Sequence, residues 1–171
     1  MSDSSSETAP PASGKAVGIG IGLGIALVVL GIGFFMLIGF IGILAAIAVP
    51  NFVAMQLKSK RAEVPGNVDG IKTAQRAYEA AYDGFIPVGS EAEARRSLTK
   101  APHPWIGGGD WETIDWQPVG DIRGGYWVTV DPNGRDYTVH GLCDVDGDGQ
   151  YAEYVATMTQ NATLVTDPDI Y

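Results

Sequence analysis

Residues 16–49 read AVGIGIGLGIALVVLGIGFFMLIGFIGILAAIAV and hold no charged side chain. A helix needs about 20 apolar residues to cross the hydrocarbon core of a bilayer, and this run is longer. No polar turn divides the run, so two separate spans are not expected. The sequence therefore predicts a single-pass membrane protein whose transmembrane helix covers residues 16–49.

A cleaved signal peptide is the alternative to a permanent span, because Ala46-Ile47-Ala48 has the small-x-small form of a cleavage site. The apolar part of a signal peptide runs about 7–15 residues, which is much shorter than this run. We therefore expect residues 16–49 to stay in the protein. The excess length would continue beyond the bilayer as an exposed helix or pack against neighbouring subunits.

Glycines are concentrated in the first half of the run and form two GxxxG pairs. The pairs are Gly18 with Gly22 and Gly20 with Gly24. Such pairs let two helices approach closely in lipid, so these four residues and Pro50 are the predicted helix-packing residues. The alternative is that the glycines only loosen the helix, since GxxxG arises easily by chance in a glycine-rich run.

The flanking sequence and the overall composition exclude several classes of protein. Residues 1–15, MSDSSSETAPPASGK, are small, polar and proline-bearing, and predict a disordered tail. The chain of 171 residues is 46% hydrophobic and 18% charged, so it is not disordered as a whole. Its net charge of −9 argues against a nucleic-acid partner. A single cysteine excludes an intrachain disulfide.

Residues 50–84 predict an amphipathic helix that continues out of the membrane. Pro50 is expected to kink the helix without ending it, and Pro65-Gly66 to interrupt it. Gly84 is the expected stop signal. From about residue 67 to 82 the helix repeats apolar residues at helical spacing, namely Val68, Ile71, Ala74, Tyr78, Ala81 and Tyr82, with Phe85 just beyond.

Residues 85–171 predict a connector followed by an antiparallel sheet. The connector, to residue 111, is rich in Pro and Gly and holds a short helix at 91–98, with Trp105 as an anchor. Alternating patterns predict strands at 125–130, 136–143 and 151–159, with a further strand or its lead-in at 111–118. A tight turn is expected at residues 131–134, which read DPNG. The predicted class is α+β, with a long N-terminal helix packed on a sheet of three or four strands.

Residues 40–52, FIGILAAIAVPNF, resemble the N-terminal helix of the type IV pilin and pseudopilin superfamily. The later segments QLKSKRAEV and IKTAQRAYEAAY resemble the part of that helix that leaves the membrane. The order of hydrophobic helix, amphipathic helix, loop and antiparallel sheet matches as well. The resemblance implies a pilin-like fold and association with the helices of other pilin-like subunits in a type IV pilus or type II secretion-like system.

The chain departs from the family pattern at the processing site. If Pro50 matches the family's helix proline, the glycine before the cut corresponds to Val28 and the glutamate of the mature helix to Gly33. The resemblance assigns that glutamate to neutralising a new N-terminal amine during assembly. Without a cut there is no such amine, so we expect an unprocessed protein retained in the bacterial inner membrane. The alternative is a divergent subunit with altered assembly.

The orientation of the chain in the membrane has two conflicting indicators. The family places its C-terminal domain outside the cytoplasm. The positive-inside rule favours the opposite, because Lys15 precedes the span whereas Lys58, Lys60 and Arg61 follow it. We follow the family and expect an extracytoplasmic C-terminal domain, with membrane lipid as the partner of residues 16–49.

The best chemical motif is the acidic loop DVDGDGQYAE at residues 144–153. Asp144, Asp146 and Asp148 alternate as in a calcium-binding loop, Gln150 offers a backbone carbonyl and Glu153 a further carboxylate. The motif is not an EF-hand, because position twelve is Val155 and strands flank the loop. The alternative is a solvated acidic hairpin turn. The sequence thus predicts calcium as the one candidate cofactor, in a stabilising role.

No pattern in the sequence predicts catalysis. His140 lies among apolar neighbours in a strand. A histidine in this position is more often a core or surface residue with its hydrogen bonds satisfied than a ligand. Three carboxylates near tryptophans suggest a sugar-binding site, namely Asp110, Glu112 and Asp115. The simpler interpretation is a solvated edge of the domain with two buried indoles. Two function classes remain, a structural or assembly subunit related to pilins and a membrane-anchored binding ectodomain that does not polymerise.

Overall fold

The structure is a computed structural model that describes the backbone of residues 14–171 and the side chains of residues 22–171. The chain divides into two compact units, one that ends at Pro50 and one that covers Asn51–Tyr171. The polar tail expected at residues 1–15 lies outside the described residues, except that Gly14 and Lys15 are already helical.

The first helix, α1, runs from Gly14 to Arg61 and contains Pro50. The predicted helix at residues 16–49 is confirmed, and it is long and apolar enough to cross a membrane. The helix continues past Pro50 because a proline removes only one backbone donor, and the remaining hydrogen bonds hold the next turns together.

A one-residue break at Ala62 separates α1 from α2, which covers Glu63–Tyr82. Pro65-Gly66 does not interrupt the helix as expected, because Pro65 lies in the first turn of α2, where proline is well tolerated. Its missing N–H leaves the Arg61 carbonyl without an α-helical donor, which explains why the break precedes it. The end of α2 is capped one residue before Gly84, by Asp83 in the left-handed conformation with φ 61°.

Four antiparallel strands follow in the order β1-β2-β3-β4. They are β1 (Gly124–Val130), β2 (Tyr137–Cys143), β3 (Ala152–Thr157) and the short β4 (Thr163–Leu164). The first three confirm the predicted strands within about two residues of their ends. The turn at residues 131–134 is also confirmed: the Asp131 carboxylate accepts the backbone N–H groups of Arg135 and Asp136, which lowers its pKa.

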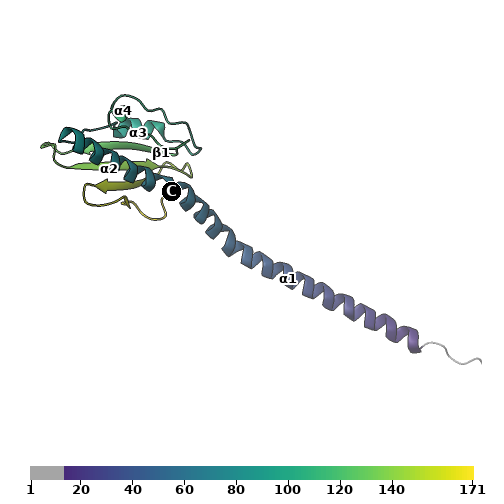
Figure 1. Cartoon of the computed structure of the whole chain (residues 1–171). Helices are drawn as coiled ribbons and strands as arrows, with labels where there is room; N and C mark the ends of the chain where they lie inside the picture. The colour runs from purple at the N-terminus through teal and green to yellow at the C-terminus, as the bar shows by residue number, and fades with distance from the viewer. Residues whose placement is uncertain (1–13) are drawn as a thin grey trace, which may run out of the picture. The chain divides into compact units, whose positions relative to one another are not determined.

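The helix α2 covers one face of the sheet, against β2 and β3 (Figure 1). Val64, Val68 and Ile71 of α2 are fully buried there. They face a group of buried strand residues, namely Tyr126, Val128, Tyr137, Val139, Cys143, Ala152 and Ala156. The close approach requires a glycine at 141, since a Cβ there would lie 2.5 Å from Val68 Cγ2 and 2.8 Å from Val64 Cγ1.

The connector contains two short helices, and one corrects a prediction. The helix α3 (Glu91–Ser97) confirms the helix expected at 91–98 and is capped by Ser90, whose Oγ accepts the Glu93 N–H. Residues 111–118 do not form a strand: α4 (Asp110–Thr113) begins there instead. The alternation of large residues reflects their packing in an aromatic cluster, not pairing with a neighbouring strand.

Candidate functional site

The apolar surface of α1 is the first candidate site. Large apolar side chains from Leu23 to Met55 are exposed, most of them by more than half of their area. A soluble protein rarely exposes an apolar patch of this extent, so lipid or other helices must cover it. Gly22 and Gly24 have open space where a Cβ would be, as a helix-packing face requires. Gly18 and Gly20 lie in α1, but their surroundings fall outside the described side chains.

The basic residues at the end of α1 have different environments. Arg61 is only 6% exposed, donates to the backbone carbonyl of Ile170 and lies over the Tyr171 ring, 5.1 Å from its centroid. Lys58 is exposed and lies 4.0 Å from the Asp169 carboxylate. From the sequence, Arg61 was considered only as one of the positive charges that bear on membrane orientation. In the fold it attaches the C-terminal residues to the start of the domain.

The acidic loop between β2 and β3 brings the three predicted aspartates together. One carboxylate oxygen each of Asp144, Asp146 and Asp148 lies within 4.8 Å of the others. The Asp144 carboxylate accepts the N–H of Gly147 at 2.6 Å and that of Gly149 at 3.0 Å. Gly149 has the positive φ of 84° that the sharp turn requires.

The remaining predicted ligands lie elsewhere or are already bonded. Gln150 donates both its backbone N–H and its side-chain amide to the Asp148 carboxylate. Glu153 lies in β3, where its carboxylate is 3.0 Å from His140 Nδ1. The three-aspartate group does not include it.

Two carboxylates of the loop have opposite electrostatic environments. Burial and the neighbouring carboxylates of Asp148 and Asp144 raise the pKa of Asp146, whereas the Gln150 N–H lowers the pKa of Asp148. Lys100 donates to the backbone carbonyl of Asp146 at 2.7 Å. A divalent cation would relieve the repulsion between the carboxylates, but calcium binding stays a prediction.

We expect Asp144→Ala to destabilise the protein by about 1–3 kcal/mol, because it removes the charge-assisted hydrogen bonds that the Asp144 carboxylate accepts from backbone N–H groups of the turn. Urea unfolding of the full chain in nonionic detergent, followed by tryptophan fluorescence, measures the change. Asp121→Ala is the matched control, since Asp121 is exposed and its loss should change stability by less than about 0.5 kcal/mol. If calcium binds, millimolar calcium raises the wild-type midpoint and leaves the Asp144→Ala midpoint unchanged.

Other candidate residues have structural roles. His140 stacks on Trp127, with ring centroids 4.5 Å apart, which confirms the satisfied-histidine interpretation. Asp110, Glu112 and Asp115 are exposed, as expected for a solvated edge. Cys143 is fully buried, and burial raises the pKa of its thiol to about 12, so this cysteine is unreactive at neutral pH.

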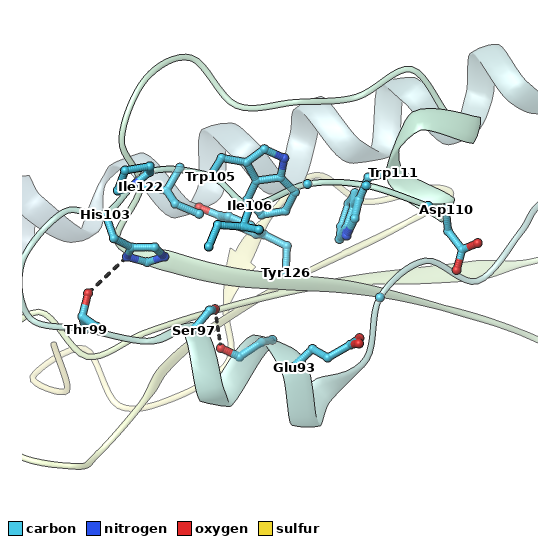
Figure 2. Close-up of a pocket in the computed structure, with 16 residues that line it drawn as sticks. Glu93, Ser97, Thr99, His103, Trp105, Ile106, Asp110, Trp111, Ile122 and Tyr126 are labelled. Carbon is cyan, nitrogen blue, oxygen red and sulfur yellow. Dashed lines mark hydrogen bonds between the residues drawn. The ribbon is translucent and has the colours of Figure 1, made fainter.

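Two features were missed by the sequence analysis. Gln75 is fully buried on α2, where its amide donates to the Ile86 carbonyl at 2.8 Å and accepts the Ile86 N–H at 3.3 Å. A cavity of about 640 Å³ is lined by residues of α3, the connector and β1 (Figure 2). In the sequence, the one signal related to this cavity is the glycine-rich connector with Trp105.

Comparison with known proteins gives one informative match. The type IV major pilin protein PilA of Myxococcus xanthus (strain DK1622) is 38% identical over 56 residues, which is 33% of this chain and 26% of that protein. The match thus spans about a quarter of the relative's length. No family model and no solved structure matches the chain. The match supports a pilin-like relation. A long apolar N-terminal helix, together with a four-stranded antiparallel sheet against which α2 packs, is a pilin-like α+β fold.

Proposed function

We propose that this protein is a structural or assembly subunit of a type IV pilus or type II secretion-like system. The observation that carries the proposal is the exposed apolar surface of α1, which is far longer than a bilayer needs. The similarity to a type IV pilin supports a role of that surface in helix association. The second candidate is a membrane-anchored binding ectodomain, stabilised by calcium, that does not polymerise.

The proposal includes an unprocessed N-terminus. Val28 and Gly33 stand where the family pattern has its cleavage glycine and helix glutamate. A chain that keeps residues 16–28 stays anchored in the bacterial inner membrane. No enzymatic activity is part of this function. The intact mass of the extracted protein tests the inference, and a mass that begins at Val29 contradicts it.

Helix association is tested by the size of the protein extracted in mild detergent, measured by native mass spectrometry. We expect assemblies of several copies. Gly24→Ile should raise the concentration needed for assembly about tenfold, because the new side chain fills the space that a neighbouring helix would occupy. Leu23→Ile is the matched control, since Leu23 already carries a bulky exposed side chain.

A strictly monomeric wild-type protein would contradict the subunit proposal and favour the anchored ectodomain. Equal assembly of the Gly24→Ile and Leu23→Ile variants would show that Gly24 does not lie in the contact between helices. That result would not contradict the proposal that the protein is a subunit.

The proposed orientation places the C-terminal domain outside the cytoplasm. Val119 is fully exposed in this domain, so a cysteine in its place will react with a membrane-impermeant maleimide. The native Cys143 is buried and should stay unlabelled. We expect Val119→Cys to be labelled in intact spheroplasts. Labelling that appears only after lysis would reverse the orientation.

A further inference from the structure

The cavity between α3, the glycine-rich connector and β1 has the size of a small-molecule site. Its volume of about 640 Å³ lies within the range of about 300–1,000 Å³ that is typical of ligand pockets. It belongs to the unit Asn51–Tyr171 and is separate from α1 and from the acidic loop. The proposed subunit role therefore leaves this cavity unexplained.

Aromatic side chains form the wall of the cavity. The indoles of Trp105 and Trp111 meet edge to face, 5.2 Å apart at an angle of 79°. The ring centroids of Tyr126 and Trp105 lie 6.3 Å apart. Asn67, which does not line the cavity, donates a hydrogen bond of 2.8 Å to the Tyr126 hydroxyl. Ile122 completes the apolar lining. These rings offer π faces and edges to a bound group.

The charged groups around this wall are acidic. Glu93 and Asp110 line the cavity, and the lining residues include no lysine or arginine. Figure 2 shows both carboxylates toward the Trp111 end and His103 at the other end. None of the ion pairs among the described side chains involves Asp110. One Glu93 oxygen accepts from Ser90 Oγ at 2.7 Å, which leaves the other available.

We propose that this cavity binds an organic cation, with its ammonium group next to Glu93 and Asp110 and its apolar body against Trp105 and Trp111. A cation gains from both carboxylates and from the ring faces. Anionic ligands such as carboxylates and phosphates are disfavoured, because the cavity offers them no cationic partner.

Three probes with one aromatic ring and different charges test the proposal: benzyltrimethylammonium, benzyl alcohol and benzoate. The readout is the indole N–H resonances of the ¹⁵N-tryptophan-labelled full chain in nonionic detergent. Trp127 is an internal control, because it stacks on His140 and does not line the cavity. We expect the cation to shift the Trp105 and Trp111 resonances, with benzyl alcohol binding at least about fivefold more weakly and benzoate not binding.

Charge-neutral variants show whether the carboxylates hold the cation. Asp110→Asn and Glu93→Gln should each weaken binding of benzyltrimethylammonium about two- to fivefold, as expected for partly solvated charge pairs. Glu112→Gln is the matched control, because Glu112 is in the same short helix as Asp110 but does not line the cavity. The Glu112→Gln variant should bind benzyltrimethylammonium with the same affinity as the wild type.

Several results would overturn the proposal. Equal binding of benzyl alcohol and the cation would show an apolar pocket without charge selectivity. Methyl glucoside serves as a fourth, sugar probe. If it bound at Trp105 and Trp111 more tightly than benzyltrimethylammonium, the cavity would be a sugar site. A shift of Trp127 as large as that of Trp105, or no shift at all, would show that the cation has no site here.

Discussion

Replacing Phe34 and Phe35 together by arginine is expected to lower the fraction of the chain that integrates into the membrane. Each arginine at the centre of a transmembrane helix costs about 2.5–3.5 kcal/mol on the insertion scale, so the pair costs roughly 5–7 kcal/mol. Two uncharged stretches remain in this variant. Residues 16–33 fall short of about 20 residues, and residues 36–57 contain Pro50, Asn51 and Gln56, so a shifted span is less favourable than the original one. Both phenylalanines are exposed on α1 and make no core contact that would confuse the result.

The matched control places the same two charges near the start of the run, with Leu23→Arg and Ile25→Arg. Residues 26–49 remain apolar and are still long enough to span, so this variant should integrate like the wild type. The measurement is the fraction of protein that resists alkaline carbonate extraction of membranes. Equal resistance of both double variants would show that membrane anchoring does not depend on the centre of residues 16–49.

Trp111→Ala is expected to lower the free energy of unfolding by about 3–5 kcal/mol, the largest single-residue effect on stability in the domain. Trp111 is 9% exposed and packs against the indoles of Trp105 and Trp116, with centroid distances of 5.2 Å and 5.1 Å. Its removal leaves a void that the short helix α4 and its two neighbouring indoles cannot fill without moving.

Urea unfolding in nonionic detergent measures this loss, because three tryptophans remain as fluorescent probes. Ile106→Ala is the control from the same connector. Ile106 is 92% exposed, so its truncation should change stability by less than about 0.5 kcal/mol. Similar shifts for the two variants would mean that the aromatic cluster contributes little to the stability of the fold.

Local patterns in the sequence predicted most of the architecture. An uncharged apolar run of this length has few stable forms other than a membrane helix. Alternation in β1, β2 and β3 and the Asp131 turn each predict structure from a few adjacent residues, and all are confirmed. The acidic loop was predicted in the same way, and its three aspartates do meet.

Errors arose where distant residues decide the outcome. The segment at Trp111 alternates like a strand but forms a short helix, because its indoles pack with Trp105 from another part of the connector. No pattern in the sequence marked Gln75, whose side chain bonds both backbone groups of Ile86. The role of Glu153 as a calcium ligand stays a prediction, and its carboxylate lies 3.0 Å from His140 Nδ1 on the neighbouring strand.

The sequence by itself determined the long apolar helix, the amphipathic helix and the strands, because each depends on hydrophobicity or periodicity within a short segment. Only the tertiary structure decided the cavity with its aromatic wall and two carboxylates, and the role of Arg61 at the C-terminus. These features require side chains far apart in the sequence to meet, and that meeting depends on how the whole chain packs.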